Sequence, residues 1–386
     1  MSREQEIAKA RQALAKKYGK EVFSATTTPT PIEVIPTGAF LLDCATGVGG
    51  FPRGRLVELF GLESSGKSTI SLSTAKNCQR LTGLPVLYLD YEHAFDISYA
   101  EKIGVDTSES MFILSQPESL EQGMSVAEYF IEQELVGLTI VDSLAAMVSE
   151  KELTTEIGHN SVALQARAMA SLLKRLTHKI HKSNSCVLFI NQLREGIATM
   201  PGRPARRTTP GGRALKFYAS MRIELAAVES VKGKVTDVLT GKTIDGPAGV
   251  KINAKVVKNK LARPFQDGTF YLGGDSGICP ELSTLELGVA RNVIKRNGSR
   301  YILPFRAPSG KAVNLAGQRA VLSFLQENPA KHDLLFDRIK ELMTNGVIPE
   351  FPDAPDSVDV DDSDDELEED TSMISGPKEI SFDSVV

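Results

Sequence analysis

The chain has 386 residues, of which 41% are hydrophobic and 24% are charged, and its formal net charge is −5. This length and composition support one large core and a smaller module. They exclude a membrane-spanning helix, since no apolar run approaches the roughly 18 residues that a bilayer requires. The four cysteines are far apart and form no C-x-x-C pair, so we expect buried thiols in a reducing, cytoplasmic compartment.

The amino terminus has the pattern of a helix on a linker. Residues 1–20 are charged with a helical period, and a Thr/Pro stretch follows over 24–31. The pattern predicts an amphipathic helix joined to an extended segment, and it is not typical of a signal or transit peptide. A helix attached in this way is expected to dock against another surface.

Residues 61–69, GLESSGKST, have the spacing G-x-x-x-x-G-K-[ST], which is typical of a phosphate-binding loop. Gly61 and Gly66 allow the tight backbone that turns several N–H groups inward. Lys67 is expected to reach the β- and γ-phosphates of a nucleotide, and Ser68 to bind Mg²⁺. The alternative is an ordinary glycine-rich turn with a solvated lysine.

The segments on either side of this loop favour the nucleotide interpretation. An apolar run before it predicts a strand, and helical spacing over 68–81 predicts the helix that follows. Between residues 33 and 275 such runs alternate with helical patterns, which predicts an α/β fold with a mostly parallel central sheet flanked by helices. The predicted strands are residues 55–60, 86–89, 138–141, 187–190, 221–225 and 251–257.

Polar side chains follow several of these strands at the sheet edge where the phosphate loop lies. Asp142 and Ser143 end one strand, and an acid in this place is expected to hold Mg²⁺ through water. Glu92 follows another strand and could polarise the water that attacks the γ-phosphoryl group, although a solvated loop glutamate is an equal alternative. Asn191 and Gln192 end a third strand, where they could sense the γ-phosphate.

A stretch without periodicity, residues 193–213, leaves this sheet edge and is rich in Gly, Pro, Thr and Arg. A basic, flexible loop is suited to contact a phosphodiester backbone, whereas a solvated surface loop is the alternative. Its origin directly after Gln192 favours nucleic-acid binding. Its arginines are Arg194, Arg203, Arg206, Arg207 and Arg213.

The rest of the chain divides into a small module and an acidic tail. Residues 276–348 have short mixed patterns with helical stretches over 318–328 and 334–344, which predict a small α/β module. The last 36 residues carry 13 acidic residues against one lysine, a net charge of −12, and leave +7 on residues 1–350. This tail is predicted to be disordered, and either to compete with a polyanion for the basic body or to maintain solubility.

Taken together, these segments resemble the bacterial RecA recombinase family over nearly the whole chain. Seven motifs occur in the family's order and at nearly its spacing: PTGAFLLD, GLESSGKST, LDYEHAFD, IVDSLAAM, FINQLR, GGRALKFYASMR and KVVKNKLARPF. The resemblance implies a RecA-type P-loop ATPase that forms helical filaments on single-stranded DNA and pairs it with homologous double-stranded DNA in ATP-dependent strand exchange. It also implies roles in DNA damage repair and the SOS response, with single-strand-binding and loader proteins as partners.

The resemblance further implies how subunits meet. It divides the chain into an N-terminal helix and docking arm, an ATPase and DNA-binding core, a small C-terminal α/β domain and an acidic tail, over residues 1–32, 33–275, 276–348 and 349–386 respectively. The arm is expected to dock on the neighbouring subunit. Lys258 and Lys260 match two catalytic lysines that reach the ATP of the adjacent subunit, an arrangement comparable to an arginine finger.

Matched position by position, the family's motifs assign an ATP and Mg²⁺ site. Glu92 falls on the catalytic glutamate, Lys67 on the phosphate lysine and Gln192 on the switch that links ATP to the basic loop. Asp96 and Tyr99 are expected to flank the adenine, with the tyrosine ring available for stacking. The predicted nucleotide-binding residues are Gly61, Glu63, Ser64, Ser65, Gly66, Lys67, Ser68, Thr69, Asp96, Tyr99, Asp142 and Ser143, with Ser68 and Asp142 at the metal.

The family holds DNA with two loops that line the filament axis. Val162 stands where the family commonly has a methionine, and Lys174 where it has an arginine, so base spacing and phosphate geometry are expected to differ slightly. Residues 232–249 are longer than the usual connection, for which the sequence offers no function. The predicted DNA-binding residues are Glu156, Ile157, Gly158, His159, Asn160, Ser161, Val162, Arg167, Lys174, Arg194, Ile197, Arg203, Arg206, Arg207, Gly211, Gly212 and Arg213.

Two other functions are compatible with the same motifs. One is a ring-forming ATPase such as a replicative helicase, and the other is a nucleotide-dependent regulator that binds proteins and no DNA. Electron microscopy would distinguish rings from filaments, and stimulation of ATP hydrolysis by DNA would exclude the regulator. The sequence leaves open whether its source is a bacterium or a phage, and whether it promotes repressor self-cleavage.

Overall fold

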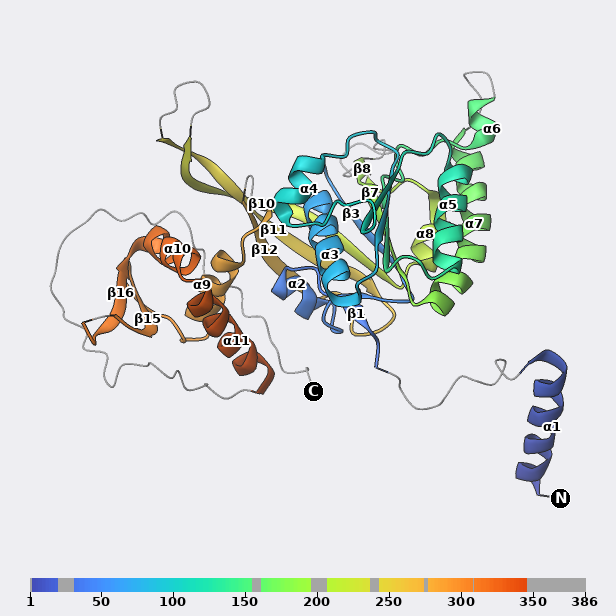
Figure 1. Ribbon diagram of the computed structural model, residues 1–386, viewed down its shortest axis with the longest axis horizontal. Coiled ribbons are helices and arrows are strands. Elements are labelled where there is room, and N and C mark those ends of the chain that lie inside the picture. The colour runs from blue at the N-terminus through green and yellow to red at the C-terminus, as the bar shows by residue number, and fades with distance from the viewer. Residues whose placement is uncertain are drawn as a thin grey trace, which may run out of the picture. The chain divides into compact units, whose positions relative to one another are not determined.

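The computed structural model describes residues 2–19, 31–154, 161–195, 207–236, 243–273, 277–307 and 309–345, with only the backbone of 161–164, 195, 207, 232–236, 243–248 and 344–345. The chain separates into two compact units, shown in Figure 1. The first contains Met1–Thr37, Leu42–Leu225 and Lys255–Asp267, and the second contains Gly38–Leu41, Ala226–Ala254 and Gly268–Val386. The predicted boundaries at residues 32, 275 and 348 stay predictions.

The amino-terminal segment forms helix α1 (Arg3–Tyr18), close to the predicted range. Its start is fixed by a capping box, in which the Gln5 amide donates to the Ser2 hydroxyl at 3.3 Å and the Ser2 amide donates to Gln5 Oε1 at 3.1 Å. Acidic residues in the first turn and lysines in the last turn complement the helix dipole. None of its residues is buried, and its docking on a second subunit stays a prediction.

The central sheet has the strand order β13-β12-β11-β10-β3-β7-β6-β4-β5. All the pairs from β10 to β5 are parallel, which confirms the predicted α/β fold with a mostly parallel sheet. The strands of this sheet are β3 (Leu56–Gly61), β4 (Val86–Asp90), β5 (Phe112–Ser115), β6 (Leu138–Asp142), β7 (Cys186–Gln192), β10 (Met221–Thr236), β11 (Thr243–Asn259), β12 (Asp267–Gly273) and β13 (Gly277–Ile278).

Helices cover the parallel strands on both faces (Figure 1). One face packs against α5 (Leu120–Glu132), α7 (Ser161–Ser183) and α8 (Gly212–Tyr218), and it buries aliphatic side chains of β4 and β6. The other face lies beneath α3 (Lys67–Thr82), which buries Ile70 and Ala75. Side chains alternate along a strand. Leu87 and Leu89 of β4 therefore enter the apolar core, whereas Tyr88 and Asp90 project from the face that α3 covers.

Shorter elements complete the first unit. They are β1 (Val34–Ile35), α2 (Phe40–Ala45), β2 (Phe51–Pro52), α4 (Ile97–Ile103), α6 (Glu150–Leu153), β8 (Arg194–Glu195) and β9 (Arg207–Thr208). The predicted aperiodic stretch after β7 therefore contains two strands, and these pair antiparallel, with Arg194 opposite Thr208. Two-residue strands leave too little alternation for a sequence pattern to reveal them.

In its described residues, the second unit contains a three-stranded antiparallel sheet and three helices around their own core. The strands are β14 (Lys295–Asn297), β15 (Arg300–Arg306) and β16 (Ala312–Ala316), and the helices are α9 (Pro280–Ala290), α10 (Gly317–Glu327) and α11 (Pro329–Asn345). Leu285, Leu303, Val321 and Ile339 lie in the core that these elements enclose.

The described residues of the long connection over 232–249 belong to two strands. Residues 232–236 extend β10 and residues 243–249 extend β11, so both strands are much longer than their predicted cores. Across the described ranges, no helix combines the length and the apolar character needed to cross a bilayer.

Candidate functional site

The phosphate-binding motif forms the connection between β3 and α3. β3 ends at Gly61, and α3 begins at Lys67 after Gly66, whose φ of +84° favours glycine. A Cβ on Gly61 would lie 2.3 Å from the Leu225 carbonyl oxygen and 2.6 Å from Ser65 Oγ, so no side chain fits there. The sequence therefore produces a tight loop that leads into the N-terminus of a helix, the usual setting of a bound phosphate.

Lys67 is buried within this loop. Its ammonium group donates to the Leu62 carbonyl at 2.6 Å, and at 3.4 Å to both the Gly61 carbonyl and Ser65 Oγ. Burial lowers the pKa of Lys67, and the nearby carboxylates of Asp142 and Glu92 oppose that change. A polyphosphate would supply the negative charge that these neutral oxygens lack.

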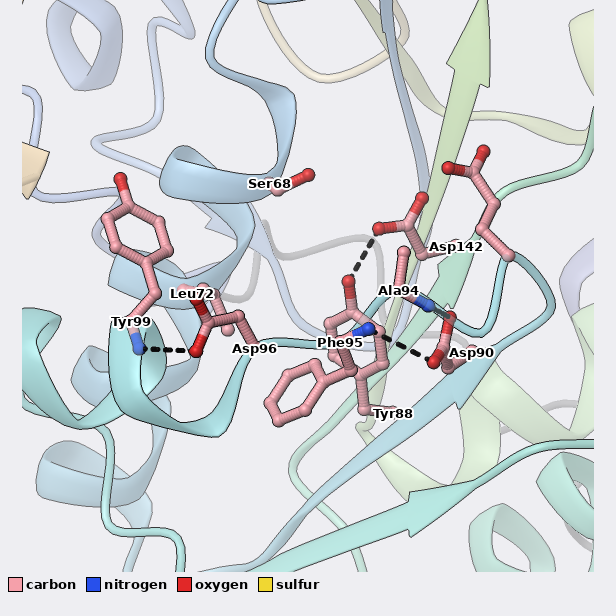
Figure 2. A pocket seen from close by; sticks show the side chains of 10 residues that line it. Ser68, Leu72, Tyr88, Asp90, Ala94, Phe95, Asp96, Tyr99 and Asp142 are labelled. Atoms are coloured by element: carbon pink, nitrogen blue, oxygen red, sulfur yellow. Dashed lines mark hydrogen bonds between the residues drawn. The ribbon is translucent and has the colours of Figure 1, made fainter.

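Asp142, the last residue of β6, is half-buried beside the phosphate loop. The pKa of its carboxyl is raised to about 6, mainly by burial and also by the charges of Glu92 and Asp90, against the hydrogen bond from Tyr88 and the charge of Lys67, which lower it. Figure 2 shows the side chains of Ser68 and Asp142 on opposite sides of one pocket. A hydroxyl and a carboxylate facing the same space suit a hydrated Mg²⁺ ion.

Glu92 lies just beyond β4, where it accepts hydrogen bonds from two other predicted site residues. Gln192 Nε2 donates to Glu92 Oε1 at 3.2 Å, and the Ser143 hydroxyl donates to the same oxygen. Three residues that are distant in the chain therefore meet at the carboxyl ends of β4, β6 and β7. A carboxylate held in this way can orient a water molecule.

One pocket collects four of the predicted nucleotide-binding residues, namely Ser68, Asp96, Tyr99 and Asp142. Asp96 caps α4 by accepting from the Tyr99 amide at 3.0 Å, and the hydroxyls of Tyr99 and Thr69 lie 2.8 Å apart in a hydrogen bond. Tyr88 and Asp90 were not predicted as site residues, although strand alternation places both on the same face as Asp142. The pocket is lined by Ser68, Leu72, Tyr88, Asp90, Glu92, Ala94, Phe95, Asp96, Tyr99 and Asp142.

Comparison with known proteins identifies the family. Residues 5–279 match the model of the RecA N-terminal domain. The chain belongs to the RecA family. It is 38% identical to Protein RecA of Streptomyces rimosus over 350 residues, which cover 90% of this chain and 88% of that protein. It is 39% identical to Protein RecA of Thermotoga neapolitana over 339 residues, or 87% and 92% of the two chains.

A solved structure, described as the crystal structure of the RadB recombinase, is similar with a TM-score of 0.45 and 22% sequence identity. The match covers 64% of this chain and 98% of that chain. The predicted RecA resemblance is confirmed by the family model and the relatives, so the chain is a member of a family of recombination and repair proteins.

The two lysines that the RecA resemblance assigns to a neighbouring subunit's ATP are not among the residues that line this chain's pocket. Lys258 donates to the carbonyls of Lys216 at 2.6 Å and Phe217 at 3.1 Å, and Lys260 donates to the Phe217 carbonyl at 3.0 Å. Both ammonium groups therefore bond the carbonyl end of α8. The pKa of Lys258 is lowered to about 8, mainly by burial and also by the positive charges of Lys260 and Arg222.

Both ends of the basic loop, residues 193–213, lie among the described residues. Arg194 and Arg213 are exposed, and the β8–β9 pair closes the loop near its base. Gly211 has a φ of +86°, and a Cβ there would lie 2.2 Å from Leu144 Cδ2. Gly212 has a φ of +70° and approaches Ala166. These two glycines therefore fix where the loop enters α8.

The remaining predicted DNA-binding residues are only partly described. Arg167 and Lys174 are exposed on α7 and lie seven residues apart, which places them on one helix face. The backbone of Ser161, Val162 and Arg207 is described without their side chains. Glu156, Ile157, Gly158, His159, Asn160, Ile197, Arg203 and Arg206 lie outside the described residues.

Proposed function

We propose that this protein is an ATP-dependent recombinase that forms helical filaments on single-stranded DNA and catalyses homologous pairing and strand exchange, with ATP hydrolysis stimulated by DNA. The observation that carries the proposal is the hydrogen bond between Gln192 and Glu92. Glu92 follows strand β4 at the edge of the nucleotide pocket, and Gln192 leads into the basic loop, so this bond connects the two sites. Nucleotide and DNA sites that share such a link can respond to one another.

The residues present fit ATP and Mg²⁺. Gly61 leaves no room for a side chain, Lys67 is buried among neutral oxygens, and Ser68 and Asp142 face one pocket. Lys67 would hold the β- and γ-phosphates, while Ser68 would bind the metal directly and Asp142 would hold its water. Bound Mg²⁺ would neutralise charge on the phosphate oxygens. Among the described residues, no group of three or more His, Cys, Asp or Glu side chains is arranged to hold a metal ion by itself, so phosphate and water would supply most of the ligands of Mg²⁺.

Glu92 is the proposed base for hydrolysis. Its Oε1 atom is held by Ser143 and Gln192, while its exposed side chain leaves the second oxygen accessible to water. In this role Glu92 accepts a hydrogen bond from the attacking water and then its proton. The side-chain amide of Gln192 donates to Glu92 and would also donate to a γ-phosphate. Because the two acceptors would compete for this amide, contact with the phosphate would weaken its bond to Glu92.

The proposed filament joins one subunit's Lys67 to Lys258 and Lys260 of the next. Both lysines already bond neutral carbonyl oxygens of α8; Lys258 is partly exposed and Lys260 is exposed. Phosphate oxygens are stronger acceptors than carbonyls because they are charged. ATP between subunits would therefore stabilise the filament, and hydrolysis would loosen it and release DNA.

DNA is proposed to contact the exposed Arg167, Lys174, Arg194 and Arg213, together with the loop residues that lie outside the described ranges. Contacts of this type are mainly to phosphates, so binding is expected to weaken steeply with salt. The acidic tail would compete for the same surface, and removing residues 351–386 is expected to speed loading on duplex DNA. Cytoplasmic location and single-strand-binding or loader partners belong to the same proposal.

Strand exchange between homologous DNAs tests this function most directly. The full-length protein should exchange strands only with ATP, and should hydrolyse ATP faster when single-stranded DNA is added. Lys67→Ala is the negative control, because it removes the phosphate lysine. Closed hexamers without filaments in electron microscopy would favour a helicase, and ATP hydrolysis indifferent to DNA would favour a regulator of proteins.

A further inference from the structure

Tyr88, a residue of β4, contacts the carboxylate at the proposed metal site. Its hydroxyl donates to Asp142 Oδ2 at 2.5 Å, and its side chain is 3% exposed. Figure 2 shows this hydrogen bond at the side of the pocket that faces Ser68. A hydroxyl that donates to an ionised carboxylate forms a stronger hydrogen bond than one between neutral groups.

The strand register explains why these two side chains meet. β4 and β6 are parallel neighbours, with Tyr88 opposite Ile140 and Asp90 opposite Asp142. Leu89 points into the core on the other face of the sheet. Tyr88 and Asp142 therefore project from the same face and are separated by one diagonal step, which a tyrosine side chain is long enough to span.

Aromatic packing fixes the tyrosine ring. The ring of Phe95 lies 4.7 Å from that of Tyr88 between centroids, and Phe112 lies 6.0 Å from Tyr88. Phe95 and Phe112 stack with centroids 5.1 Å apart. The Phe95 amide in turn donates to Asp90 Oδ2 at 3.2 Å. The hydroxyl of Tyr88 is thus presented from a rigid support instead of a mobile side chain.

We propose that Tyr88 is a positioning residue for Mg²⁺, which holds one oxygen of Asp142 so that the other faces the metal's water shell. This inference rests on the proposed nucleotide function. A terminal carboxylate rotates with little preference, so a single fixed hydrogen bond decides where its free lone pairs point. Hydrogen-bond partners of metal-site carboxylates commonly change metal affinity 10- to 100-fold when they are removed.

The alternative is that Tyr88 only fills the core. Tyr88→Phe separates the two roles, because it keeps the ring against Phe95 and Phe112 and removes the hydroxyl alone. Tyr91→Phe is the matched control. Tyr91 is also a buried tyrosine of this segment, and its hydroxyl lies 3.5 Å from the Leu120 carbonyl instead of Asp142.

The test measures how much Mg²⁺ strengthens nucleotide binding. A fluorescent, non-hydrolysable ATP analogue is titrated into the full-length protein with excess MgCl₂ and, separately, with EDTA. The ratio of the two dissociation constants is expected to fall about tenfold in Tyr88→Phe, while binding in EDTA changes little. Tyr91→Phe should keep the wild-type ratio, and Tyr88→Phe should have no further effect on the ratio when combined with Asp142→Asn.

Three results separate failure of this inference from failure of the proposed function. Dissociation constants of Tyr88→Phe that stay at the wild-type values both with and without Mg²⁺ would overturn the positioning role. Equal weakening of binding with and without Mg²⁺ would also overturn it, because a purely structural residue acts on both. A wild-type protein whose nucleotide affinity does not depend on Mg²⁺ would instead overturn the nucleotide site itself, and with it the role of Tyr88.

Discussion

Replacing Asp142 by asparagine is expected to stabilise the protein in the absence of nucleotide and metal. The pKa of this carboxyl is raised to about 6 from an ordinary 3.8, mainly by burial and also by the charges of Glu92 and Asp90. At pH 7.5 the carboxyl is nevertheless ionised, so the folded state carries the cost of a buried charge. Asparagine has nearly the same shape, is neutral, and still offers Tyr88 an oxygen acceptor.

The size of the effect follows from proton linkage. Each pKa unit corresponds to 1.36 kcal/mol, so the difference between about 6 and 3.8 gives an upper value of about 3 kcal/mol. Because the folded-state pKa is raised, stability falls as pH rises through the range from 3.8 to about 6. The cost is complete above that range, is about half as large at pH ~5, and disappears below it.

Thermal unfolding in EDTA at two pH values checks this reasoning. At pH 7.5, Asp142→Asn should raise the melting temperature of the first unit by about 6 °C, from roughly 2 °C per kcal/mol for a unit of this size. At pH ~5 the gain should be about half. Asp267→Asn, at an exposed position of the same unit, should change neither value. An equal gain at both pH values, or no gain at all, would refute the argument.

Three further substitutions probe other contacts. Glu92→Gln should keep ATP and DNA binding and slow ATP turnover 10²- to 10⁴-fold or so, measured at saturating DNA; normal turnover would exclude Glu92 as the base. Arg222→Met should destabilise the protein by about 3 to 5 kcal/mol in urea unfolding, because it leaves the fully buried Glu58 carboxylate without its ion pair; a loss below about 1 kcal/mol would contradict this. Gly211→Ala should cost about 1 to 3 kcal/mol from its positive φ and its clash with Leu144, and this cost should be smaller when the substitution is made in a Leu144→Ala background, which lacks the clashing side chain.

The sequence predicted the parts of the site whose spacing is local. The phosphate loop over 61–69 is a contiguous motif between a strand and a helix, so its geometry follows from neighbouring residues. The contact of Glu92 with Gln192 spans 100 positions, and only the order of β4, β6 and β7 in the sheet brings the two together. A family resemblance supplied these roles, which periodicity alone left as equal alternatives.

The features that were missed are those that depend on which face of a strand a residue occupies. An apolar run such as residues 86–89 predicts a buried strand, but burial does not show that Tyr88 would use its hydroxyl at a site. Likewise, Lys258 and Lys260 look like the solvated edge of a strand, whereas both bond carbonyls at the end of α8. That arrangement depends on tertiary packing, which no local pattern encodes.

The alternation along β4 also limits how this part of the chain can change in length. A shift of one residue in its pairing with β6 would move every side chain to the opposite face. Leu87 and Leu89 would then enter the nucleotide pocket, while Tyr88 and Asp90 would be forced into the apolar core. Insertions and deletions within β4 should therefore abolish folding and function together, whereas β10 and β11 already accommodate a lengthened connection at their far ends.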